Sequence, residues 1–330
     1  ALLVAPGAAP ARIDPDVVAT PVTWGDGPPA GWPDAPPASA RSYVLVDADT
    51  GQVLAGRAAE EPRVVASTIK LLTVLTALDT LAFDDEVVVP VEAAVGGAGA
   101  SVDPGETWRV DDLVDAVLVR SGNDAARALA LAASDGDLTA FVDRMQQVAA
   151  SLGVADATIQ DPTGLDDANR LSARDLATIA RAALADDRIR ASAGQSAVDL
   201  PDLGPLENRN LLVGAYAGAT GLKTGFTDLA GYCLVASAER DGRELVAVVL
   251  GAREDPARFD EAAALLDLGF EQLDSLDWDA LRARVPGGWV DLLPAGRVSA
   301  PPDPGPTVAL APAPGGIELR ARSGDQVLGT

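Results

Sequence analysis

The sequence predicts an α+β fold, in which strands from both halves of the chain form one antiparallel sheet around a buried helix. Strand-like segments occur early, within residues 43–55, and again late, within residues 220–250. Between them, residues 67–81 read as a helix with apolar side chains on nearly every face, a pattern typical of a buried helix. The simplest assembly is a five-stranded sheet flanked by helices, with this helix packed against it.

The first part of the chain predicts an extended arm followed by a hairpin. Residues 1–40 are rich in Pro, Ala and Gly, which is typical of an extended arm. Residues 43–46 and 52–55 have strand composition, and the turn residues between them predict an antiparallel pair. The acidic turn lacks the other ligands of a calcium loop, so we expect an ordinary turn.

The middle of the chain predicts a helical subdomain, and the last third returns to strands. Ser172 and Asp175 have the spacing of a capping box, which predicts a helix to about residue 184. The Asp241-Gly242 pair is a strong signal for a tight hairpin. Further helices are expected at 111–119, 124–133, 138–152 and 256–268, and the late strands at 220–227, 232–238 and 244–250.

Composition shifts divide the chain into three predicted parts. These are the arm (1–40), a main domain (41–275) and a small β-rich C-terminal segment (276–330), whose Pro- and Gly-rich stretches alternate with short apolar runs.

The residues that the chain lacks exclude several kinds of active site. The sequence has no histidine and one cysteine, Cys233, which we expect to be a buried strand residue. A Ser-His-Asp triad, a Cys-His pair, a zinc finger and a His-ligated metal are therefore impossible. A general base must be a carboxylate, a lysine or a tyrosine, and no metal or cofactor is expected.

The net charge of −24 argues against a nucleic acid or an anionic membrane surface as a partner. No stretch is apolar for long enough to span a bilayer. The apolar, Ala-rich residues 1–9 fit either the tail of a trimmed secretion signal or an ordinary Ala-rich arm.

The two lysines are the first candidates for chemistry. Of the 25 basic residues only Lys70 and Lys223 are lysines, and a buried lysine can lose its proton whereas arginine cannot. On the predicted helix, Ser67 and Lys70 are three residues apart and share one face. A serine hydroxyl beside a desolvated lysine, at the positive end of a helix, is one way to activate a nucleophile.

Three short motifs combine into a more specific signal. They are Ser67/Lys70, Ser121-Gly122-Asn123 and Lys223-Thr224-Gly225, and each alone is common. Both lysines fall inside these motifs, and with ordinary compositions that joint coincidence is roughly one in a thousand or rarer. The set is typical of serine acyltransferases that form a covalent intermediate.

With these motifs the chain resembles the low-molecular-mass penicillin-binding proteins of the D-alanyl-D-alanine carboxypeptidase type. The resemblance runs from Tyr43 to Phe270 and includes segments 121–126, 162–165, 208–210 and 231–238. It implies a β-lactamase/transpeptidase-like fold. One departure is Arg170, because the family commonly has a histidine after the asparagine of this loop, here Asn169.

The resemblance also implies roles for the residues of the first two motifs. Ser67 would attack the carbonyl of the penultimate D-Ala and form an acyl-enzyme, with Lys70 as the base. Ser121 would relay a proton to the departing amine. Asn123 would bond Lys70 and the substrate amide.

The third motif and its surroundings would bind the substrate. The oxyanion hole would be the backbone N–H groups of Ser67 and Phe226. Gly225 would leave room for the ligand. The residues implied to hold the terminal carboxylate are Lys223, Thr224 and Arg258. Arg209 is a further candidate, although a role in a structural ion pair would explain an arginine at this position equally well.

The implied substrate is a peptidoglycan stem peptide ending in D-Ala-D-Ala, with β-lactam antibiotics as covalent inhibitors. The implied place of action is outside the cytoplasmic membrane, in cell-wall synthesis and cell shape. Two alternatives stay open. A class A-like β-lactamase would carry Glu-x-x-Leu-Asn and Ser-Asp-Asn motifs, which the chain lacks. A wall-binding homologue without turnover would not need every motif residue, and all are present.

Overall fold

The computed structural model describes residues 34–36, 38–49, 51–154, 156–200 and 203–271 with their side chains, and beyond them only the backbone of residue 272 and of short strands. The chain divides into two compact units, one of residues 34–270 and one of residues 1–33 with 271–330. The three-part division expected from composition stays a prediction.

The larger unit is built on one antiparallel sheet of five strands in the order β10-β11-β12-β2-β3. The two early strands and the three late ones therefore join as predicted. Their bounds are β2 (Ser42–Asp47), β3 (Val53–Arg57), β10 (Ala219–Thr227), β11 (Gly231–Arg240) and β12 (Arg243–Ala252).

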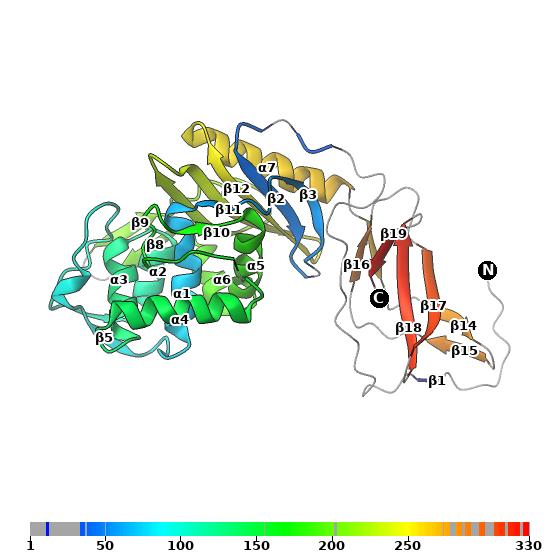
Figure 1. Cartoon of the computed structure of the whole chain (residues 1–330), viewed down its shortest axis with the longest axis horizontal. Coiled ribbons are helices and arrows are strands. Elements are labelled where there is room, and N and C mark those ends of the chain that lie inside the picture. The colour runs from blue at the N-terminus through cyan, green and yellow to red at the C-terminus, as the bar shows by residue number, and fades with distance from the viewer. Residues whose placement is uncertain are drawn as a thin grey trace. The chain divides into compact units, whose positions relative to one another are not determined.

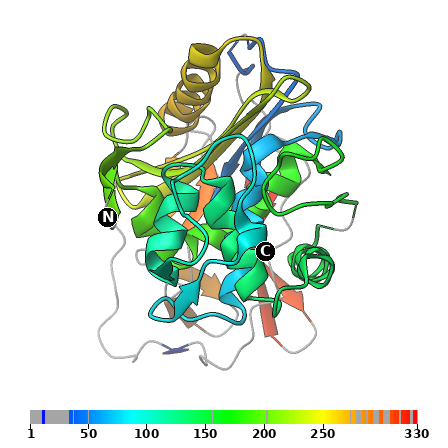
Figure 2. The same cartoon turned by 90° about the vertical axis from the view of Figure 1, so that its left-hand side faces the viewer.

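Helices cover both faces of this sheet, so that the sheet is the middle layer (Figures 1 and 2). The helix α7 lies on one face and the helical part of the unit on the other. The bounds are α1 (Lys70–Leu78), α2 (Val110–Leu118), α3 (Asn123–Ala132), α4 (Leu138–Ser151), α5 (Ala173–Leu184), α6 (Asp187–Ala193) and α7 (Asp255–Gln272), with 3-10 turns η1 (Ala66–Ile69) and η2 (Val91–Ala93).

The helix predicted at residues 67–81 is buried as expected but differs at both ends. It begins as the 3-10 turn η1, because Ala66 has a left-handed φ of 48° and the Thr68 N–H bonds back to the Val65 carbonyl. The α-helix ends at Leu78, and the Leu81 N–H still bonds to the Ala77 carbonyl. Leu71, Leu72, Val74 and Ala77 are all fully buried in the core.

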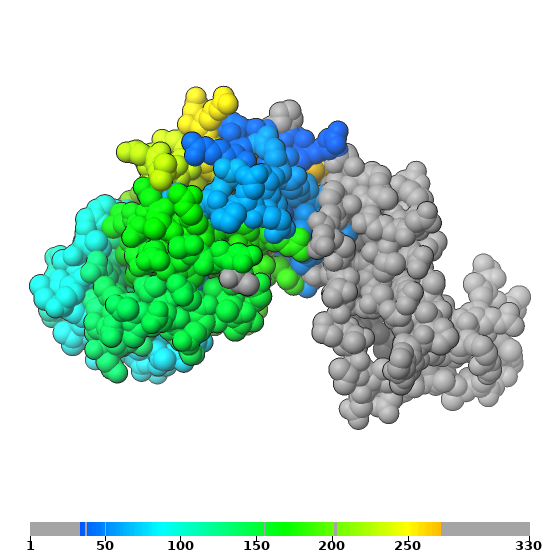
Figure 3. Space-filling view, viewed as in Figure 1, coloured from blue at the N-terminus to red at the C-terminus, as the bar shows by residue number. Residues whose placement is uncertain are grey.

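Short ribbons that the sequence did not predict connect the layers. They are β4 (Arg63–Val64) with β7 (Arg170–Leu171), β5 (Glu86–Val88) with β6 (Thr107–Arg109), and β8 (Ala197–Leu200) with β9 (Gly204–Glu207). The space-filling view shows the early strands of this unit, in blue, beside its last residues, in yellow (Figure 3), and α5 contacts β2. The core thus joins segments from both ends of the unit.

The smaller unit contains only short strands among its described residues. Their bounds are β1 (Ala11–Arg12), β13 (Asp274–Asp277), β14 (Arg282–Val285), β15 (Gly288–Asp291), β16 (Arg297–Ala300), β17 (Thr307–Ala313), β18 (Gly316–Ser323) and β19 (Gln326–Gly329). They form sheets β1-β15-β14, β13-β16 and β17-β18-β19. In the described part of the chain, no helix is both long and apolar enough to cross a membrane.

Candidate active site

Ser67 and Lys70 face each other at the start of the buried helix. The Lys70 Nζ lies 2.7 Å from the Ser67 Oγ. Ser67 is partly exposed, whereas the residues on both sides of it are buried. Ser67 is therefore the residue of this turn that a bound molecule can reach.

The Lys70 amine is completely buried and held by three oxygen atoms. Besides the Ser67 hydroxyl, it lies 2.7 Å from Asn123 Oδ1 and 2.6 Å from the Thr163 carbonyl oxygen. The charged amine has three N–H groups for these three oxygens, whereas the neutral amine has two for Asn123 and Thr163 and a lone pair for the hydroxyl. The geometry therefore accommodates both protonation states.

The electrostatics of the site favour the neutral form. The pKa of Lys70 falls from 10.5 to about 7, mainly because the amine is buried, and the positive charge of Arg209 contributes to this lowering. The carboxylates of Asp161 and Asp124 act in the opposite direction. Desolvation is the largest cause, so the shift depends on the packing around the amine.

The second motif lies at the N-terminus of α3. Asn123 is its first residue, and its side-chain Nδ2 donates to the Gly96 carbonyl at 2.9 Å. This bond orients the Asn123 Oδ1 toward Lys70. Ser121 is nearly buried, has a left-handed φ of 64°, and its hydroxyl bonds to no described residue. A non-glycine residue in this conformation often marks a functional site.

The third motif lies on β10, the edge strand of the sheet. Lys223 is buried, and its Nζ donates to the Thr224 carbonyl at 2.9 Å. Burial is the main cause that lowers its pKa well below the usual value, followed by the positive charges of Lys70, Arg209 and Arg258. The two lysines therefore belong to one electrostatic unit.

Gly225 lets β10 lie directly against the turn that carries Ser67. A Cβ at this position would be 3.0 Å from the Ser67 nitrogen and 3.1 Å from the Val65 carbonyl oxygen. Space for a ligand was the expected reason for a glycine here, and contact with η1 is a second reason within the protein. Phe226 follows and is half exposed, with its ring 4.5 Å from that of Tyr232.

The loop before β7 completes the surroundings of Ser67 and Lys70. Asp161 accepts bonds from the backbone N–H groups of Thr163 and Gly164, and the buried Asn169 donates to the Asp161 carboxylate at 3.0 Å. A Cβ on Gly164 would overlap the Ala66 carbonyl. The loop thereby fixes the Thr163 carbonyl that faces Lys70.

Comparison with known proteins agrees with this geometry. Residues 31–254 match the model of the D-alanyl-D-alanine carboxypeptidase family. The chain belongs to this family.

Curated relatives of the chain are also named D-alanyl-D-alanine carboxypeptidases. The chain is 37% identical to the D-alanyl-D-alanine carboxypeptidase DacB2 of Mycobacterium tuberculosis over 73% of this chain and 86% of that protein. It is 33% identical to DacF of Bacillus subtilis over 72% of this chain, which spans 63% of that longer relative. The family model thus covers most of the larger unit, and some relatives are much longer than the part that this chain matches.

Solved structures of the family superpose well on the chain. A penicillin-binding protein homologue from M. tuberculosis has a TM-score of 0.70 at 34% identity, covering 81% of this chain and 100% of its own. The Streptomyces K15 DD-transpeptidase has a TM-score of 0.68 at 28% identity, covering 72% of this chain and 100% of its own. The expected β-lactamase/transpeptidase-like fold is thereby confirmed.

The two arginines predicted to bind substrate occupy different surroundings in this family member. Arg209 is exposed and near enough to lower the pKa of both lysines. Arg258 extends from α7, donates to the Gly225 carbonyl at 3.1 Å and pairs with Asp255 at 2.5 Å. The contacts of Arg258 are with the protein itself, and its positive charge reaches Lys223.

The sequence reasoning assigned no role to Asp161 or Thr163, although segment 162–165 was one of the family-like segments. A backbone carbonyl has no sequence signature of its own. The turn residues around it were the available signal. Cys233 is buried as expected, and burial raises its pKa to about 11. Within the described residues, no cluster of His, Cys, Asp and Glu could hold a metal ion.

Proposed function

We propose that this chain is a serine-type D-Ala-D-Ala carboxypeptidase that removes the terminal D-Ala from peptidoglycan stem peptides. The observation that carries the proposal is the buried, easily deprotonated Lys70 amine 2.7 Å from the Ser67 hydroxyl. This arrangement supplies a nucleophile with its base without any histidine.

Acylation begins with proton transfer. The neutral Lys70 amine takes the Ser67 proton as the serine oxygen attacks the carbonyl carbon of the penultimate D-Ala. The developing oxyanion is bound by the N–H groups of Ser67 and Phe226, whose backbones Gly225 brings together. Because this charge exists only after attack, the two donors stabilise the transition state more than the substrate.

The leaving group then needs a proton on its amine nitrogen. The Ser121 hydroxyl, which has no partner among the described residues, is free to relay it from Lys70. Asn123 holds Lys70 in place and offers its amide to the substrate backbone. A water molecule later attacks the acyl-enzyme by the same chemistry in reverse, releasing the shortened peptide.

The terminal carboxylate is the group that distinguishes a carboxypeptidase substrate. Lys223 has no acidic partner among the described residues, so a bound carboxylate would supply the missing counter-charge. Thr224 adds a hydroxyl, and Arg209 and Arg258 add positive potential. The binding of an anion here raises the charged fraction of Lys223.

β-Lactam antibiotics fit the same site, since they offer a reactive amide carbonyl and a carboxylate. We place the enzyme on the outer side of the cytoplasmic membrane, where peptidoglycan is assembled, with a role in wall synthesis and cell shape. With its net charge of −24, the chain has no electrostatic attraction for nucleic acid.

One specific observation favours a second candidate. The similar Streptomyces K15 protein is named a DD-transpeptidase. Transpeptidation in general differs from hydrolysis only in the group that takes the acyl unit. Both reactions release D-Ala. Product analysis with an added amine acceptor separates them, because transfer gives a new amide and hydrolysis gives the free acid.

The deciding experiment is incubation with a fluorescent penicillin and with diacetyl-Lys-D-Ala-D-Ala. We expect a covalent adduct on Ser67 and stoichiometric release of D-Ala. An adduct on a different residue, or no D-Ala release from an acylated and folded protein, contradicts the proposal.

A further inference from the structure

A pocket beside the proposed active site is lined by three arginines. It lies between the β4–β7 ribbon, the turn from β10 to β11 and the ends of β12 and β2. Its volume is about 110 Å³, enough for several waters or for a carboxylate group. The lining residues are Arg41, Pro62, Arg63, Val64, Arg170, Leu229, Ala230 and Gly251, and all charged residues among them are arginines.

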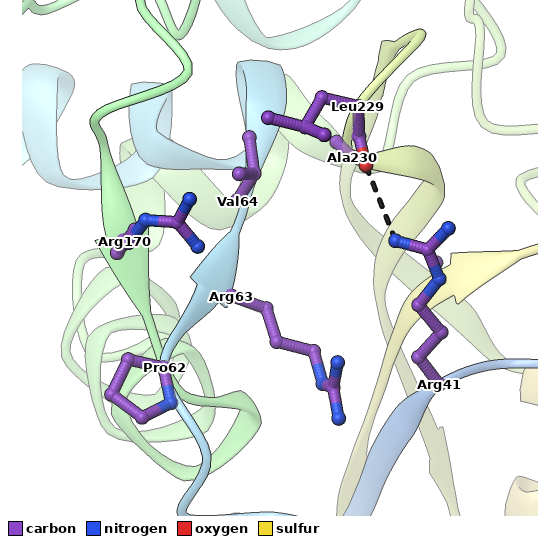
Figure 4. Close-up of a pocket in the computed structure, with 8 residues that line it drawn as sticks. Arg41, Pro62, Arg63, Val64, Arg170, Leu229 and Ala230 are labelled. Atoms are coloured by element: carbon purple, nitrogen blue, oxygen red, sulfur yellow. Dashed lines mark hydrogen bonds between the residues drawn. The ribbon is translucent and has the colours of Figure 1, made fainter.

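The arginine side chains extend into the pocket from three separate segments (Figure 4). Arg41 donates to the Leu229 carbonyl at 3.3 Å, which leaves further donors of its guanidinium for a ligand. Arg63 pairs with the exposed Glu61 at 2.5 Å. Arg170 is exposed and makes no side-chain hydrogen bond or ion pair with any described residue.

The lining itself carries three positive charges and no carboxylate, in a strongly acidic protein. Near it, Glu61 offsets Arg63, Asp167 is bound by the Thr227 hydroxyl at 2.8 Å, and Asp228 belongs to the adjoining turn. An exposed ion pair such as that of Glu61 contributes about 0–1 kcal/mol, so a better acceptor displaces it readily. Planar guanidinium groups bind carboxylates in a bidentate manner.

On two segments of the chain, residues that line the pocket are only a few residues away from the proposed reacting residues. Val64 precedes Ser67 by three residues, and Leu229 follows Phe226 by three. Three residues of extended chain span at most about 10 Å. A peptide bound at Ser67 therefore reaches the pocket within a few residues.

The direction of the bound peptide follows from the proposed function. If the terminal carboxylate lies at Lys223 and Thr224 and the reacting carbonyl at Phe226, the acyl part of the peptide continues along β10 toward Thr227. An extended peptide beside an edge strand advances about 3.3 Å per residue. Two or three residues before the reacting carbonyl, it arrives beside Leu229.

We propose that this pocket, with Arg41, Arg63 and Arg170, binds a carboxylate on the acyl side of the peptide substrate. The proposal rests on the proposed function and extends it from the terminal D-Ala-D-Ala to the preceding residues. It gives Arg170 a function at the position where the chain departs from its family's usual histidine.

The test uses two substrates that differ in one group. Both are N-acetylated tetrapeptides of γ-linked D-glutamate, Nε-acetyl-lysine, D-Ala and D-Ala, and the glutamate carries either its free α-carboxylate or an α-amide. The rate at which the full 330-residue chain releases D-Ala gives kcat/KM for each of the two substrates. We expect the acid to be favoured about tenfold, and less so at 0.5 M salt, because salt screens exposed charges.

The main variant is Arg170→Gln, because its side chain has no protein partner to lose. We expect it to reduce the acid-to-amide ratio to about one. Arg41→Gln should reduce the same ratio. The matched control is Arg144→Gln on α4, an exposed arginine paired with Asp79, which should keep the wild-type ratio.

Several outcomes overturn the proposal. Equal kcat/KM for acid and amide in the wild type does so, as does a ratio that survives the combined Arg41 and Arg170 substitutions. An equal ratio together with competitive inhibition by inorganic phosphate identifies a free-anion site instead. Hydrolysis of both peptides at one rate leaves the carboxypeptidase function intact, whereas hydrolysis of neither refutes that function and this inference with it.

Discussion

The acylation rate of Ser67 should depend on pH through Lys70. With a pKa of about 7, the neutral fraction of Lys70 rises from about one tenth at pH 6 to about nine tenths at pH 8. Since only the neutral amine can take the serine proton, the second-order rate constant for acylation should rise about tenfold over this range. It should level off above pH 8.

The size of the pKa shift of Lys70 comes mainly from its burial. The pKa falls from 10.5 to about 7, a change that corresponds to about 5 kcal/mol of differential stabilisation of the neutral form. The same shift links to folding. Because the folded pKa lies below the unfolded one, the unfolded chain binds this proton first, so the free energy of unfolding falls as the pH drops from 10.5 to about 7, and the loss is complete below that pH.

The assay is stopped-flow acylation by a fluorescent penicillin between pH 5.5 and 9, with circular dichroism to show that the fold persists. Lys70 and Lys223 interact, so an inflection in the wild type belongs to the pair. Lys223→Arg fixes the charge at position 223, and an inflection that remains in this variant belongs to Lys70. A flat profile, or an inflection only above pH 9, would show that Lys70 is protonated throughout and refute its role as base.

Four further outcomes are expected. Ser67→Ala should abolish penicillin labelling while leaving the thermal midpoint nearly unchanged; mass spectrometry of an adduct on the variant would contradict this. Lys70→Arg should be nearly as inactive as Lys70→Ala, because a guanidinium cannot act as a base, and more than about a tenth of wild-type acylation would reduce Lys70 to electrostatic support. Amidation of the terminal D-Ala should lower kcat/KM by roughly a hundredfold, because a charge-assisted bond is lost and a cation is left unpaired. Lys223→Ala should erase most of the difference between the acid and the amide. Equal rates on the acid and the amide would mean that the carboxylate is not recognised. Gly164→Ala should destabilise the fold by more than about 2 kcal/mol in denaturant unfolding, because the φ of 81° and the overlap with the Ala66 carbonyl both oppose a side chain. A variant as stable as the wild type would show that the loop moves freely.

The sheet and the central helix could be predicted because their signals are local and strong. The strands carry β-branched residues and hairpin turns, and α1 is apolar on nearly every face, which only a buried helix tolerates. The candidate site could be predicted because two lysines in a chain of arginines coincide with two of three motifs. In both cases the residue types tolerate only a few kinds of structural surroundings, so the sequence alone indicates the structure.

Other features depend on contacts between distant backbones. Thr163 faces Lys70 across 93 residues of sequence, through a carbonyl that any residue would supply. The left-handed Ala66 has no signal in residue type, so the 3-10 start of the helix was missed. The position of Arg170 beside Val64 comes from a two-residue ribbon, too short to predict from composition.

The positive charges of the site link substrate binding to catalysis. Lys223, Arg209 and Arg258 lie near one another, and Lys70 and Arg209 are among the charges that lower the pKa of Lys223. The same positive potential that attracts a terminal carboxylate therefore opposes protonation of the amine that must act as base. A bound carboxylate partly cancels that potential and raises the lysine pKa values. The cancellation is greatest at Lys223, where we propose that the carboxylate binds, and smaller at Lys70, whose pKa is set mainly by burial. In the proposed mechanism, the buried position of Lys70 is thus what allows one cluster of cations to hold an anionic substrate and still retain a neutral base.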